Sequence, residues 1–150
     1  IVYNHLPDKK NIEDIFGPQI IVDENDEYQE KFDKLLATAT SLSIKEVVKE
    51  VNKRNGLVIP SHIDKSNGLI KNLGLIPEDL DIEVMEIFHK TSIEDYIEKF
   101  PILKNLILIK NSDSHYLKEI KPKMELKLEN PDWKEILKVL KEKKNRKLFL

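Results

Sequence analysis

The chain is predicted to fold as an α/β domain with parallel strands and outer helices. Residues 57–59 form a short apolar run without alternation of polar and apolar residues, which is typical of a strand that is covered on both faces. The runs at 84–88 and 106–109 are two further strand candidates. Helical patterns lie between or beside these runs, and alternation of helices with strands implies parallel strands with helices outside the sheet.

The first helix is predicted over residues 43–54. Ser43 and Glu46 form a capping-box pattern, in which each side chain satisfies a free backbone amide of the first turn. Apolar residues then recur at helical spacing, namely Val47, Val48 and Val51. Gly56 stands where a helix C-cap needs a left-handed residue. The strand at 57–59 follows directly.

The second and third strands are expected at residues 84–88 and 106–109, with a helix between them. Ser92 is a suitable N-cap for this helix, which we expect to continue to about Lys99. A strand, a helix and a second strand in this order predict a crossover unit with parallel strands.

A last helix is predicted after Pro131, which suits the first helical position, with Asn130 as its cap. Its apolar stripe would consist of Trp133, Ile136, Leu137 and Leu140. The basic stretch at 138–147 is interpreted as a solvated helix end. At the other end of the chain, residues 1–3 resemble a strand already under way and lack an initiator Met, so we expect the chain to begin inside a domain.

Composition narrows the possible functions. The 150 residues are 40% hydrophobic and 35% charged, which fits one globular domain over residues 1–150. Lys and Arg total 25 against 27 for Asp and Glu, so charge does not indicate a nucleic-acid partner, although it does not exclude one. Without cysteine, a metal can be bound only through His, Asp or Glu, and we expect a cytoplasmic protein. The apolar runs are too short for a membrane span.

Three metal-capable side chains follow predicted strands. His62 comes just after the strand at 57–59, and Asp113 and His115 come just after the strand at 106–109. Functional residues of parallel α/β folds gather at the carboxyl ends of strands. In an extended segment, residues two apart point the same way, so Asp113 and His115 could reach one metal. Two imidazoles and a carboxylate suit zinc, manganese or iron. For each fragment alone, an ordinary surface histidine is an equally good interpretation.

Several sequence blocks together resemble the PHP (polymerase and histidinol phosphatase) family of metal-dependent phosphoesterases. The blocks are GLVIPSHIDK at 56–65, LGLIPEDL at 73–80 and SDSHYL at 112–117. Upstream, IFGPQIIVDENDE at 15–27 is similar to an insertion found in one bacterial and archaeal branch of that family. The order and spacing of these blocks are more specific than an Asp-x-His pair alone.

The resemblance implies part of a distorted seven-stranded β/α barrel of the TIM type, with divalent metals at the carboxyl ends of its strands. It also implies that His62, Asp113 and His115 are metal ligands and catalytic residues. The implied activity is phosphoester hydrolysis by a metal-activated water, on a phosphorylated small molecule or a nucleic-acid end.

The chain departs from the family pattern at other ligand positions. The family's N-terminal His-x-His block, its later Asp-His block and a Glu on an early strand are not found. We therefore expect a domain that lacks its N-terminal part. Two alternatives remain open: a non-catalytic structural or regulatory domain with an incomplete metal site, and a nucleic-acid processing enzyme. His5 is interpreted as a surface residue, His89 as either structural or substrate-facing, and Glu86 as a mid-strand residue that supports the site.

Overall fold

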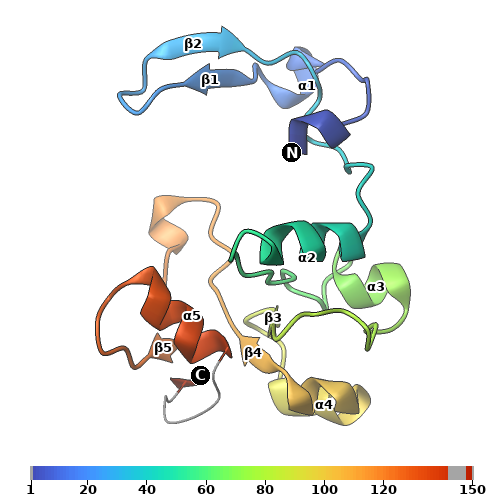
Figure 1. The fold of residues 1–150 in the computed structure, drawn as a ribbon, viewed down its shortest axis with the longest axis vertical. Coiled ribbons are helices and arrows are strands. Elements are labelled where there is room, and N and C mark those ends of the chain that lie inside the picture. The colour runs from blue at the N-terminus through green and yellow to red at the C-terminus, as the bar shows by residue number, and fades with distance from the viewer. Residues whose placement is uncertain (1, 142–147, 150) are drawn as a thin grey trace. The chain divides into compact units, whose positions relative to one another are not determined.

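The computed structural model describes residues 2–141 and 148–149, and they belong to two compact units, Ile1–Val47 and Val48–Leu150. Helix α2 (Ile44–Asn52) begins in the first unit and ends in the second. Figure 1 shows the elements of both units in chain order. Because two compact units can belong to one domain, the single domain over residues 1–150 stays a prediction.

The first unit is built around an antiparallel hairpin. Strand β1 (Ile20–Val22) pairs with β2 (Tyr28–Lys31), and helix α1 (Glu13–Phe16) precedes them. The strand expected at residues 1–3 is wrong, because Val2–His5 form a turn of 3-10 helix, η1. Without a partner strand, a short β-rich run has no ladder to join.

The second unit contains the predicted crossover. Strands β3 (Val84–Glu86) and β4 (Ile107–Ile109) pair in parallel, with Val84 opposite Ile107 and Glu86 opposite Ile109. Helix α4 (Ile93–Lys99) and the 3-10 helix η2 (Pro101–Asn105) connect them, which confirms the prediction of a strand, a helix and a parallel strand. The other elements of this unit are α3 (Leu69–Leu73), η3 (Leu117–Glu119), β5 (Glu125–Leu126), α5 (Trp133–Lys141) and β6 (Leu148–Phe149).

The strand expected at 57–59 is not formed as a regular strand, although its end runs beside β3. Glu86 donates its backbone N–H to the Pro60 carbonyl at 3.0 Å and accepts one from Ile63 at 3.0 Å. Only these two bonds join the segment to β3, so the ladder is too short to count as a strand. The apolar side chains still behave as predicted, because Leu57 and Ile59 pack against the core of Val84, Ile109 and Leu140.

Within the part of the chain that the structure describes, the sheets are three separate pairs and form no closed barrel. The predicted barrel of the PHP fold, of which this chain would be a part, therefore remains a prediction. Over the same described residues, no helix combines the length and apolar character that a membrane span requires.

Two helix caps follow the sequence pattern. At α2, Glu46 Oε2 accepts the Ser43 N–H at 2.8 Å, and Ser43 Oγ accepts the Glu46 N–H at 3.3 Å, which confirms the capping box. At α4, Ser92 Oγ accepts the Asp95 N–H at 3.2 Å, as expected of its N-cap.

Other features of the helix ends differ from the prediction. The left-handed residue after α2 is Asn55, with φ of 56°, and not Gly56. Asn is the residue other than glycine that best tolerates this conformation. At α5 the cap is Asp132 rather than Asn130, since Asp132 Oδ1 accepts the Glu135 N–H at 2.8 Å. Trp133 is exposed, so it does not belong to the buried stripe. Of the basic stretch, residues 142–147 lie outside the described residues.

Candidate functional site

His62 and Asp113 both have a left-handed backbone, with φ of 26° and 52°. Only four non-glycine residues among those described have positive φ. His62 follows the segment whose Pro60 carbonyl accepts the Glu86 N–H, and Asp113 follows β4, so each comes just after a segment that pairs with β3. Such a conformation costs about 1–3 kcal/mol for a non-glycine residue and persists only where the surroundings impose it. The backbone therefore turns sharply at both positions.

The loop that carries His62 is fixed by backbone contacts. Ile63 is fully buried and hydrogen-bonds through its N–H to β3. Behind it, the chain at Gly68 passes so close that a Cβ there would lie 2.5 Å from the His62 carbonyl oxygen and 2.6 Å from that of Ile63. Real Cβ contacts essentially never reach this distance, so only glycine fits at position 68 without a shift of the backbone.

Glu86 is the last residue of β3, and not a mid-strand residue as expected, and it contacts both loops of the site. It is 8% exposed, and its Oε2 accepts a hydrogen bond from Asn111 Nδ2 at 3.1 Å. Its Oε1 lies 3.8 Å from Nδ1 of His62, which is ion-pair range but longer than a hydrogen bond. Glu86 thus joins the loop after β4 to the loop that carries His62.

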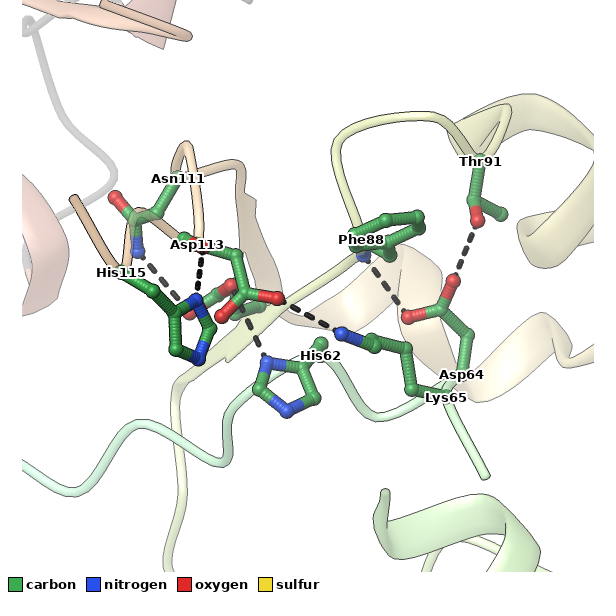
Figure 2. A network of polar contacts seen from close by, with 9 residues as sticks. His62, Asp64, Lys65, Phe88, Thr91, Asn111, Asp113 and His115 are labelled. Atoms are coloured by element: carbon green, nitrogen blue, oxygen red, sulfur yellow. Dashed lines mark hydrogen bonds and ion pairs between the residues drawn. The ribbon is translucent and has the colours of Figure 1, made fainter. Parts of the chain in front are cut away.

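Asp113 is paired with a lysine. Its Oδ2 accepts a hydrogen bond from Lys65 Nζ at 2.8 Å, and this bond lowers the pKa of the Asp113 carboxyl below its ordinary value of 3.8. The charges of His62 and His115 lower the same pKa further, by smaller amounts. Lys65 Nζ also lies 4.8 Å from the centroid of the Phe88 ring. Figure 2 shows the Asp113 carboxylate directed toward Lys65.

Asp64 connects the His62 loop to the loop that follows β3. Its Oδ1 accepts the Phe88 backbone N–H at 2.9 Å, and its Oδ2 accepts the Thr91 hydroxyl at 2.5 Å. Both bonds are visible on the right of Figure 2. Because Asp64 lies between His62 and Lys65 in sequence, these bonds hold the loop that carries both residues against the end of β3.

His115 is exposed and its ring turns back toward its own segment. Its Nδ1 lies 3.0 Å from the Asp113 carbonyl oxygen and donates to it, while its backbone N–H donates to Glu119 Oε2 at 3.1 Å. The expectation that Asp113 and His115 point the same way from an extended segment is wrong, because Asp113 is left-handed rather than extended.

The structure brings the three predicted residues into one polar cluster, yet their side chains do not converge on a common point. Within residues 2–141 and 148–149, no group of three or more His, Asp or Glu side chains is placed to hold a metal ion. The donor types suit a divalent metal, but a lysine ammonium holds the Asp113 carboxylate and the His115 ring is turned to a carbonyl. In this arrangement the residues do not fit a metal ion, and the ligand roles of His62, Asp113 and His115 stay predictions.

Two residues of the cluster, Asp64 and Lys65, were not predicted as site residues from the sequence. Both stand in the same block as His62, at 56–65, so a charged pair two and three residues after the histidine was the available signal. His5 belongs to the other unit, where its Nδ1 lies 3.1 Å from Ser41 Oγ.

Comparisons with known protein families, with curated proteins and with solved structures find no match to this chain.

Proposed function

We propose that this chain contributes His62, Asp113 and His115 to the centre of a metal-dependent phosphoesterase of the PHP type. The reaction class is phosphoester hydrolysis, with zinc, manganese or iron as the cofactor and a phosphorylated small molecule or a nucleic-acid end as the substrate. The observation that carries the proposal is the pair of left-handed residues, His62 and Asp113, each just after a segment that pairs with β3. Strained backbone of this kind concentrates at functional sites.

The contacts of Glu86 also favour a functional site at these loops. Glu86 is buried at the end of β3 and reaches both loops, through a hydrogen bond from Asn111 and a 3.8 Å approach to His62. A buried carboxylate is costly unless it is hydrogen-bonded or paired, and here both of its partners belong to the site. Carboxylates behind metal ligands commonly orient imidazoles, a role that Glu86 could take for His62 if the two approached to hydrogen-bond distance.

Metal binding would require two local changes. Lys65 would have to release Asp113, and the His115 ring would have to turn away from the Asp113 carbonyl. Both are side-chain movements of partly or fully exposed groups, and neither requires β3 or β4 to move.

A second candidate function is a non-catalytic structural or regulatory domain of the same type. The Lys65–Asp113 ion pair favours it, because an ammonium already neutralises the carboxylate that a metal would need. In this case the cluster would hold the two loops together and bind no ion.

Metal content distinguishes the two candidates. We would purify the protein with zinc and with manganese, dialyse it, and measure bound metal by mass spectrometry for the wild type, Asp113→Asn, His115→Ala and the control His5→Ala. The proposal expects metal in the wild type and the control and its loss in the two site variants. Metal that is unchanged in both site variants would contradict the ligand roles. A wild type without metal would favour the non-catalytic domain.

A binding signal would then be followed by hydrolysis of bis(p-nitrophenyl) phosphate and p-nitrophenyl phosphate. Activity that disappears with Asp113→Asn and persists with His5→Ala would support the enzyme. Metal that is bound without hydrolysis of either ester would argue for a structural metal.

A further inference from the structure

A basic pocket lies beside the candidate site. It has a volume of about 580 Å³, and Asp113 and His115 form part of its wall. Its other lining residues include five lysines: Lys65, Lys90, Lys118, Lys121 and Lys123. This concentration of positive charge contrasts with the whole chain, whose formal net charge is −2.

Four of these lysines make no ion pair with any residue that the structure describes, namely Lys90, Lys118, Lys121 and Lys123. Lys118 instead has its Nζ 5.7 Å from the centroid of the Tyr116 ring. Lys90 comes from the loop after β3, whereas the other three come from residues 118–123, before β5. Two separate segments therefore bring unpaired cations to one pocket. Like charges held this close repel one another, and an anion between them would relieve the repulsion.

The remaining charges of the pocket do not cancel this surplus. The pocket lining contains two acidic side chains, Glu119 and Asp113, of which Asp113 is paired with Lys65, against five lysines. Burial lowers the pKa of His89, and the nearby charges of Lys123 and Lys90 lower it further. The lowered pKa keeps His89 from adding to the charge of the lysines at neutral pH.

We propose that this pocket binds a small molecule with two or more adjacent phosphate groups. Four ammonium groups without an ion pair exceed the charge of one phosphate, whereas a diphosphate carries more negative charge spread over more oxygens. The volume lies within the range of ordinary small-ligand sites, about 300–1,000 Å³. Lysine is a common phosphate ligand in proteins. Binding of the anion does not depend on the proposed function. The further claim that this anion is the substrate does rest on the proposed function, because the pocket shares Asp113 and His115 with the candidate site.

The test uses metal-free protein and inorganic pyrophosphate as the probe. Isothermal titration calorimetry would compare the wild type with Lys121→Gln/Lys123→Gln and with a control of equal charge, Lys104→Gln/Lys127→Gln. Both control lysines are exposed and lie outside the pocket. We expect the wild type and the control to bind pyrophosphate alike, and the pocket variant to bind at least about tenfold more weakly, since it loses two of the charge contacts. Orthophosphate should bind more weakly than pyrophosphate.

Three results would overturn the proposal. These are no binding of pyrophosphate by the wild type, equal weakening in both double variants, or an affinity for orthophosphate equal to that for pyrophosphate. A random-sequence single-stranded oligonucleotide serves as a competitor. If it binds more tightly than pyrophosphate and loses affinity in the pocket variant, the ligand is nucleic acid and the small-molecule assignment is wrong. Because no metal is present, failure of the metal-content experiment leaves these outcomes unchanged.

Discussion

Replacing Asp64 with alanine should loosen the loop that carries His62. The carboxylate accepts hydrogen bonds from the Phe88 backbone N–H and from the Thr91 hydroxyl. The variant removes both bonds and leaves the Phe88 N–H, which is part-buried, without its partner. Because the affected contact joins two loops, we expect both a lower free energy of unfolding and a local opening of these loops.

The size of the effect follows from these two bonds. A hydrogen bond to a charged group contributes about 1.5–3 kcal/mol net. Since Asp64 is only half-buried, water replaces part of what is lost, and we expect Asp64→Ala to lower the free energy of unfolding by about 2–4 kcal/mol. Thr91→Val removes one of the two bonds and should cost about 1 kcal/mol.

Two measurements check this prediction. Urea denaturation would give the free energy of unfolding for each variant, with Asp8→Ala, an exposed aspartate, as the control. Amide hydrogen exchange would report the Phe88 N–H directly, and a loss of about 1.4 kcal/mol or more corresponds to at least tenfold faster exchange. The reasoning is refuted if Asp64→Ala leaves Phe88 exchange unchanged and unfolds within about 0.5 kcal/mol of the control.

Three more predictions concern the same unit. Lys65→Gln should raise the pKa of Asp113 toward 3.8, as measured by NMR of the carboxyl group, and an unchanged pKa would exclude the ion pair. In the wild type the pair stabilises the fold above pH 3.8, and this contribution is lost as the pH falls through the lowered pKa of Asp113. Ile63→Ala should cost about 2–5 kcal/mol in urea denaturation, because Ile63 is fully buried, and a cost below about 1 kcal/mol would contradict its core position. His89 should have a pKa below 6.5 by NMR of its ring, and Lys123→Gln should raise this pKa only slightly, because burial is the larger cause of the shift. The free energy of unfolding should fall as the pH drops through 6.5, because the unfolded chain then binds a proton at this histidine before the folded protein does. A normal His89 pKa would show that the ring is solvated.

Local signals in the sequence predicted the central crossover well. The capping residues Ser43 and Ser92 and the apolar runs of β3 and β4 act within a few residues, so their structural outcome follows from neighbours along the chain. Elements that depend on a distant partner were harder to predict. Residues 57–59 have the composition of a strand, but the two backbone bonds to β3 come from Pro60 and Ile63, which follow them.

The last helix shows a similar limit. Trp133 has the right spacing for the apolar stripe, yet it is exposed while Glu135 is buried at 4% exposure. Periodicity indicates that a helix has one apolar side, but the orientation of that side depends on the neighbouring elements. The prediction of the helix is confirmed, and the position of its buried face was wrong in part.

For the candidate site, the sequence predicted which loops meet but not how their side chains point. His62 and Asp113 lie in one cluster because each follows a segment that pairs with β3. The pairing of Asp113 with Lys65 joins residues 48 positions apart, which no local pattern reveals. The metal-ligand roles therefore remain predictions that the experiments above can test.

The close passage of the chain at Gly68 adds a main-chain contact to the side-chain bonds that hold the His62 loop. One added methyl group at this glycine would meet the His62 carbonyl oxygen at 2.5 Å, so the backbone of His62 would have to move. A single carbon atom, far smaller than any binding partner, would thus suffice to displace the imidazole without contacting the ring.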